Sequence, residues 1–73
     1  MDKKYWLINV QFDSKVGYSM VVHCGAQTIE DAISMAADAK LFNEDADANI
    51  ATGEEADEDT IKHFKEWKLI QEL

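Results

Sequence analysis

The stretch "YWLINVQF" (residues 5–12) decides the fold, because strongly apolar side chains occupy every second position in it. Successive side chains of an extended strand point to opposite faces. One strongly apolar face holds Trp6, Ile8, Val10 and Phe12, and the other holds Tyr5, Leu7, Asn9 and Gln11. The sequence therefore predicts a strand whose first face packs into a core.

A second alternating stretch, "YSMVVHC" (residues 18–24), follows after the turn-forming residues "DSKVG" (residues 13–17). The two stretches predict an antiparallel hairpin. The expected pairs are Phe12 with Tyr18, Val10 with Met20, Ile8 with Val22, and Trp6 with Cys24. A slip of one residue would move the apolar side chains of one strand to the wrong face.

The next segment, residues 28–42, has the pattern of a helix that packs on this sheet. Thr28 is a good N-cap residue, and Glu30 and Asp31 lie in the first turn, where the helix dipole favours anions. Its apolar stripe consists of Ile29, Ala32, Ile33 and Ala36. Lys40 lies near the expected C-terminal end, where the dipole favours a cation.

An acidic connector, residues 43–59, precedes a second helical pattern. Within it, "ANIAT" (residues 48–52) could form a short edge strand. Asp59 is the expected cap of the second helix, which continues to about Trp67. The pattern of residues 68–73 leaves helix and strand open, because their apolar side chains fit neither period clearly.

These segments predict one α+β domain over residues 1–73. We expect a small antiparallel sheet, formed by the hairpin with or without a third strand, in the order ββα(β)α. Two helices are expected to cover one face of this sheet. A hairpin alone is barely stable, so an unpaired strand edge would be open to strand addition or dimerisation.

Acidic residues dominate the charge: fifteen Asp and Glu stand against seven Lys and no Arg, for a formal net charge of −8. This charge repels nucleic acid phosphates and anionic lipids, which argues against direct nucleic acid binding and favours a basic partner. No apolar run approaches the roughly 20 residues that span a bilayer. Cys24 is the single cysteine, which is typical of a reducing compartment, so we expect a soluble cytoplasmic protein.

The acidic connector contains half of a calcium-binding pattern. Asp45, Asp47 and Asn49 fit the first three ligand positions of an EF-hand loop. Ile50 stands where the loop needs a turn glycine, and Ala56 stands where it needs a bidentate glutamate. We therefore expect no calcium site, and weak divalent-cation binding by clustered carboxylates is the alternative.

No other residue set suggests a metal site or an active site. His23 and Cys24 are neighbours on a strand and face opposite sides, so they cannot bind one ion together. The sequence shows no Ser-His-Asp set and no glycine-rich phosphate loop, and 73 residues leave little room to enclose a substrate. We expect no metal, no cofactor and no enzymatic activity.

The candidate partner-binding residues are carboxylates at the end of the acidic connector, with three large side chains as anchors. They are Glu54, Glu55, Asp57, Glu58, Asp59, Tyr5, Leu7 and Trp67. Tyr5, Leu7 and Val21 form an exposed apolar patch if no element covers their face. The simpler interpretation of the charge run is a solvated connector that keeps a small protein in solution.

We expect a non-enzymatic protein that binds a basic protein surface, such as that of a nucleic-acid-binding complex. Carboxylates about 6 to 7 Å apart on a helix or strand can match every second phosphate of a nucleic acid strand. In size and charge the chain resembles anti-CRISPR and anti-restriction inhibitors of phages and mobile elements, although no motif is shared. The alternative is an interaction module or homodimer joined through strand edges or the face of Tyr5, Leu7 and Val21.

Overall fold

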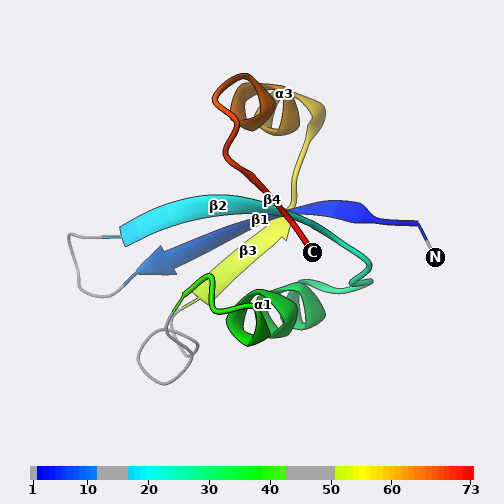
Figure 1. Ribbon diagram of the computed structural model, residues 1–73, viewed down its shortest axis with the longest axis vertical. Coiled ribbons are helices and arrows are strands. Elements are labelled where there is room, and N and C mark those ends of the chain that lie inside the picture. The colour runs from blue at the N-terminus through cyan, green and yellow to red at the C-terminus, as the bar shows by residue number, and fades with distance from the viewer. Residues whose placement is uncertain (1, 12–16, 43–50) are drawn as a thin grey trace.

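The computed structural model describes residues 2–11, 17–42 and 51–73, which form strands and helices in the order ββαβαβ (Figure 1). The strands are β1 (Lys4–Gln11), β2 (Gly17–Cys24), β3 (Ala51–Glu55) and β4 (Ile70–Glu72). The helices are α1 (Ile29–Asp38) and α3 (Glu58–Glu66). The prediction of a small α+β fold with two helices is confirmed.

The four strands form one mixed sheet in the order β3-β1-β2-β4. β1 is antiparallel to both β2 and β3, whereas β4 is parallel to β2. The expected order ββα(β)α, with a purely antiparallel sheet, is therefore wrong in detail. A helix between two strands returns the chain to the same end of a sheet, so the β3-α3-β4 crossover makes β4 run parallel to β2.

The hairpin forms as predicted, but its register differs from the expected one by two residues. The observed pairs are Trp6 with Val22, Ile8 with Met20, and Val10 with Tyr18. A shift of two residues keeps every side chain on its original face, so alternation fixes the faces without fixing the pairs. Phe12, which was expected opposite Tyr18, lies outside the described residues.

The main core lies between α1 and the sheet face that carries Trp6, Ile8 and Val22. Trp6 is 6% exposed, and its indole Nε1 donates a hydrogen bond to the carbonyl oxygen of Ala26 at 3.3 Å. The helix contributes small side chains, which let its backbone approach the sheet closely. The buried alanines of α1 are Ala32, Ala36 and Ala37.

The predicted N-cap of α1 is confirmed, because the Thr28 side chain accepts a hydrogen bond from the Asp31 amide at 3.2 Å. The helix ends at Asp38, so Lys40 lies beyond its last turn. Lys40 adopts a left-handed conformation with φ of 60°, and the Leu41 amide donates to the Ala36 carbonyl oxygen. This is the Schellman arrangement, in which glycine is the usual left-handed residue.

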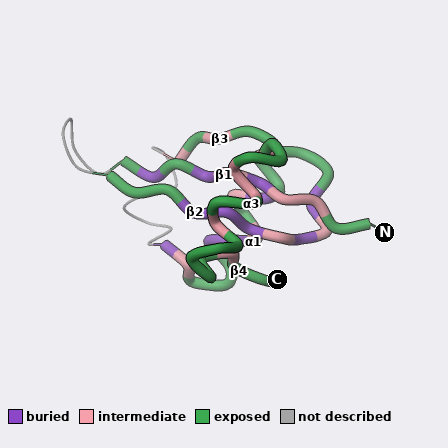
Figure 2. Tube along the Cα trace, turned by 90° about the horizontal axis from the view of Figure 1, so that it is seen from above, coloured by how far each residue is buried: buried purple, intermediate pink, exposed green. Residues whose placement is uncertain are grey.

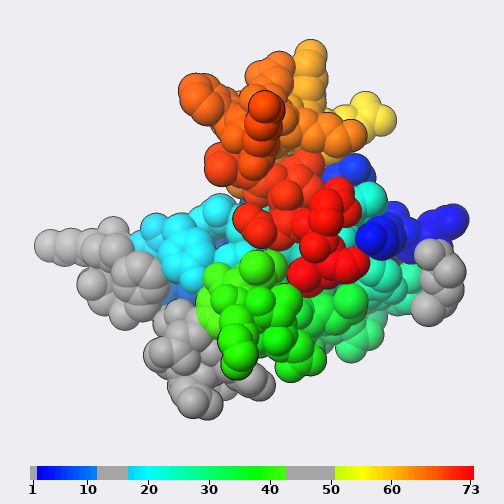
Figure 3. Space-filling view, in the orientation of Figure 1, coloured from blue at the N-terminus to red at the C-terminus, as the bar shows by residue number. Residues whose placement is uncertain are grey.

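The second helix, α3, covers the opposite face of the sheet from α1, so the expectation that both helices share one face is wrong (Figure 1). On this side Val21 is fully buried. α3 packs on the sheet with little burial, since none of its residues is buried. Ile61 and Phe64 are half-buried. Figure 3 shows α3 standing above the sheet, with the C-terminal residues between it and α1.

The C-terminal segment changes from helix to strand within a few residues. α3 ends at Glu66, Lys68 adopts a left-handed φ of 57°, and the Leu69 amide donates to the Phe64 carbonyl oxygen. This second Schellman arrangement turns the chain into β4, so the segment that was open between helix and strand forms a strand over Ile70–Glu72. Within the described ranges, no helix has the length and apolar character needed to cross a membrane.

Candidate functional site

Five carboxylates lie together where β3 leads into α3, and we call this group the acidic ledge. It consists of Glu54, Glu55, Asp57, Glu58 and Asp59. The first two end β3, the third caps α3, and the last two form the first turn of that helix. All five side chains are exposed, so the ledge is open to a partner.

The strand part of the acidic ledge presents a carboxylate on each face of the sheet. Glu55 pairs with Trp6 and so lies on the α1 face, whereas Glu54 pairs with Leu7 and lies on the α3 face. The connection after them is fixed, because the Ala56 amide donates a hydrogen bond to the Tyr5 carbonyl oxygen at 2.9 Å. The ledge is therefore built on ordered elements.

Asp57 is the N-cap of α3, so the prediction of Asp59 as the cap is wrong: Asp59 lies two residues further along, in the first turn of the helix. The backbone amide of Thr60 donates to Oδ1 of Asp57 at 2.7 Å. This bond, together with a bond from the Thr60 side chain, lowers the pKa of Asp57 from its ordinary value. Asp57 and Asp59 are two residues apart in a similar acidic context, and only the backbone conformation distinguishes the cap.

None of the five carboxylates of the acidic ledge forms an ion pair with another described residue. The ion pairs found in residues 2–11, 17–42 and 51–73 both involve Glu72, which pairs with Lys3 and His23. Glu58 and Asp59 instead meet the positive end of the α3 dipole, which stabilises them without removing their charge. The ledge therefore keeps a net negative field towards solvent.

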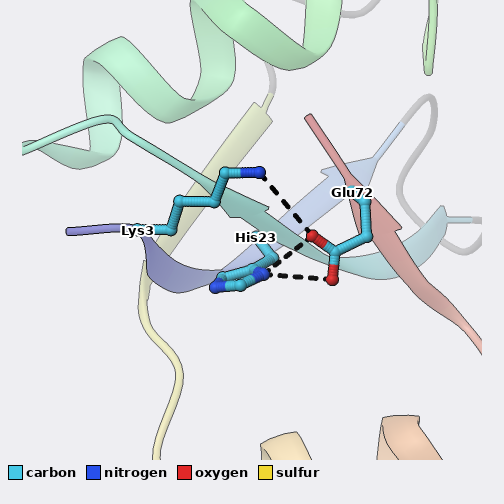
Figure 4. Close-up of polar contacts among 3 residues, drawn as sticks. All are labelled: Lys3, His23 and Glu72. Carbon is cyan, nitrogen blue, oxygen red and sulfur yellow. Dashed lines mark hydrogen bonds and ion pairs between the residues drawn. The ribbon is translucent and has the colours of Figure 1, made fainter. Parts of the chain in front are cut away.

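A polar cluster that the sequence did not reveal joins β2 to β4 (Figure 4). Nδ1 of His23 lies 2.8 Å and 3.0 Å from the two carboxylate oxygens of Glu72, and Lys3 Nζ lies 4.0 Å from the same carboxylate. The His23 ring also stacks on Tyr5, with ring centroids 4.1 Å apart. The signal was absent from the sequence because His23 and Glu72 are 49 residues apart.

The outward histidine and core cysteine predicted for the end of β2 are confirmed. Cys24 is fully buried on the α1 face, while His23 is half-buried on the other face. The described part of the chain holds no group of three His, Cys, Asp or Glu side chains that could bind a metal ion. Asp45, Asp47, Asn49 and Ile50 lie outside the described residues.

The three predicted anchor residues differ in accessibility. Tyr5 and Leu7 are half-buried on the face covered by α3, and Lys65 Nζ lies 5.5 Å from the centre of the Tyr5 ring. The patch of Tyr5, Leu7 and Val21 depended on an uncovered face, and that condition is not met. Trp67 lies outside the core with 66% of its surface exposed, which leaves it free to contact a partner.

A shallow hollow of about 240 Å³ lies near the start of β2. Its lining combines apolar and small polar groups: Tyr18, Ser19, Met20, Leu41, Leu69 and Gln71. No residue pair in this lining joins a nucleophile to a basic side chain, which nucleophilic catalysis would need. The lining of this hollow therefore contains no candidate nucleophile paired with a base.

Comparison with known proteins assigns no family to the chain. No family model matches the sequence, and neither a curated protein nor a solved structure matches it.

Proposed function

We propose that this protein is a non-enzymatic binding protein that engages a basic partner surface through the acidic ledge. The observation that supports the proposal most strongly is the exposure of five carboxylates within residues 54–59, none of which forms an ion pair with another described residue. Their attachment to β3 and α3 gives the charges fixed positions. A fixed array loses less conformational entropy on binding than a flexible tail.

The basic partner that fits this array best is a protein surface that normally binds nucleic acid. Five carboxylates within six residues give a dense run of negative charge, as the phosphates of a nucleic acid strand do. In this form of the proposal the protein is an inhibitor of the anti-CRISPR or anti-restriction type, which occupies the nucleic acid channel. The cytoplasm, where such complexes act, is the expected compartment.

Charge alone gives limited affinity, since an exposed ion pair contributes at most about 1 kcal/mol. Binding interfaces commonly take most of their free energy from a few large side chains near the centre. Trp67, at the C-terminal end of α3, is the exposed aromatic that can supply this contribution. We assign the carboxylates to steering and specificity, and Trp67 to the apolar part of the contact.

The test compares two variants with the same net charge and different charge positions. One carries Glu54→Gln, Glu55→Gln, Asp57→Asn, Glu58→Gln and Asp59→Asn. The matched control carries Asp2→Asn, Glu30→Gln, Asp31→Asn, Asp38→Asn and Glu66→Gln, at exposed positions that do not belong to the acidic ledge. Binding to immobilised polylysine is measured over a range of salt concentrations, as is displacement of duplex DNA from a lysine-rich linker histone.

We expect the ledge variant to lose most of its binding and its ability to displace DNA, while the control keeps most of both. Added salt should weaken binding of the unchanged protein, because exposed charges are screened. Equal binding by the two variants would show that net charge alone, without the ledge, determines the interaction. In that case the proposal is wrong.

A further inference from the structure

The strand β3 forms an open edge of the sheet. It pairs with β1 on one side, and Figure 2 shows no described element beyond it on the other. An edge strand presents unpaired amide and carbonyl groups, which can bond to the backbone of another extended chain. This feature is independent of the charge of the acidic ledge.

The backbone groups on this edge can be assigned from one hydrogen bond. Because the Ala56 amide donates to Tyr5 on β1, alternate residues of β3 face the same neighbour, and Glu54 is one of them. Gly53 and Glu55 alternate with these residues along β3, so their backbone groups face the other way. Their amide and carbonyl groups therefore point away from the sheet, where another strand could bond to them.

The charges beside the edge favour a basic strand over a second copy of this acidic chain. Lysine and proline often protect natural edge strands, but β3 has neither. It carries Glu54 and Glu55 instead, so two copies with a net charge of −8 each would repel one another. A lysine or arginine opposite Glu54 would form a favourable cross-strand pair.

The two faces of the edge differ in character. On the α1 face, Glu55 lies at the end of β3, whereas Gly53 has no side chain, and Ile29 Cδ1 lies 3.1 Å from the position that a Cβ atom would take at Gly53. Ile29 is half-buried, so an apolar side chain from an added strand could pack against it. On the α3 face, the neighbours are Thr52 and Glu54, which favour a basic side chain.

We propose that the open edge of β3 accepts an extended partner segment as a fifth strand, with basic side chains opposite Glu54 and apolar side chains towards Ile29. This inference rests on the proposed function and specifies the partner segment that the acidic ledge binds. In an antiparallel fifth strand, the partner residues opposite Gly53 and Glu55 would exchange backbone hydrogen bonds with them. These partner residues carry the apolar side chains.

The test uses three short peptides of alternating lysine and valine that all have the same net charge. The first is unmodified, the second has the backbone nitrogens of its valines methylated, and the third has those of its lysines methylated. Valine amides are expected to face β3, so valine methylation should abolish binding, whereas lysine methylation should leave most of it. Unmodified peptide should slow amide exchange of Gly53 and Glu55 roughly tenfold or more, because peptide hydrogen bonds replace water.

Glu54, whose amide faces β1, is the internal control and should change little in exchange rate. If all three peptides bind equally and exchange at Gly53 and Glu55 stays fast, the fifth-strand proposal is wrong, while charge-driven binding stands. If polylysine binds and the alternating peptide does not, the fifth-strand proposal also falls. If neither polylysine nor the peptide binds, the proposed function itself is wrong.

Discussion

His23 and Glu72 are joined at close range: Nδ1 of the histidine lies 2.8 Å from one carboxylate oxygen and 3.0 Å from the other (Figure 4). The Leu73 amide also donates to the His23 carbonyl oxygen at 3.0 Å, so backbone and side-chain bonds join the C-terminal segment to β2 at the same residue. β4 has three residues and ends the sheet. This contact therefore fixes the C-terminal strand against β2.

Replacing Glu72 by alanine should loosen β4 without unfolding the protein. Glu72 is 62% exposed, so we expect the free energy of unfolding to fall by less than about 1 kcal/mol. The Leu73 amide should exchange faster, as measured by NMR. Glu66→Ala is the control, since the side chain of this exposed glutamate forms no ion pair with another described residue. Unchanged Leu73 exchange in Glu72→Ala would contradict a holding role.

Gly53→Ala should destabilise the sheet. A Cβ atom at Gly53 would overlap the Leu7 carbonyl oxygen and approach Ile29, so β3 would have to move away from β1. Overpacking of this kind typically costs about 1 to 3 kcal/mol. The control is Gly25→Ala, because a Cβ atom there has no neighbour within 4 Å. Urea denaturation should therefore separate the two variants, and equal midpoints would be inconsistent with the close approach.

Lys68→Gly should stabilise the protein. Lys68 adopts a φ of 57°, which costs a residue with a Cβ atom about 1 kcal/mol or more and costs glycine little. Lys62→Gly removes the same charge inside α3, where glycine costs about 1 kcal/mol. Thermal unfolding should shift upwards in the first variant and downwards in the second. Shifts of the same sign would argue against the strained turn.

The two tryptophans should respond oppositely in stability and binding. Trp6 is 6% exposed, and truncation to alanine should lower the free energy of unfolding by about 3 to 5 kcal/mol. Trp67 is 66% exposed, and Trp67→Ala should change the free energy of unfolding by no more than about 0.5 kcal/mol. Calorimetry measures both values. Trp67→Ala should nevertheless weaken binding to the linker histone, and full retention would remove it as an anchor.

Asp57→Asn should reduce the acid sensitivity of α3. The pKa of Asp57 is lowered in the folded state, so its charged cap contributes stability above the ordinary pKa, roughly 4. That contribution is lost as the pH falls through the folded-state pKa. Asparagine caps a helix about as well and does not titrate, so its variant should lack this loss.

Exchange of the Thr60 amide over the acid range measures the effect, because this amide donates to Asp57. Asp57→Ala is the control and should weaken α3 at every pH. Parallel pH profiles for the unchanged protein and Asp57→Asn would show that charge on the cap has no role.

Local patterns predicted the features that depend on neighbouring residues. Alternation identified the core face of the hairpin, including the buried Cys24. Thr28 was recognised as a cap because the preference arises from its own side chain and a nearby amide. The exposure of the acidic ledge followed from its charge, since five carboxylates without cations cannot be buried cheaply.

Other features depended on contacts between distant segments and could not be predicted in the same way. The two-residue register shift keeps the same faces, so no hydrophobic pattern distinguishes the alternatives. Residues 68–73 fit neither period clearly, and the Schellman turn at Lys68 lacks the glycine that normally marks it. The assignment of Asp57 rather than Asp59 as cap depends on the backbone after β3.

The sequence by itself determined an acidic α+β protein with an apolar hairpin face and a helix of small residues against it, because these properties follow from composition and period. The tertiary structure alone decided that α3 covers the second face, that β4 pairs parallel to β2, and that β3, beside the acidic ledge, is an edge strand among the described residues. Each of these depends on where a crossover returns the chain. That choice is made by long-range packing, as in the contact between His23 and Glu72.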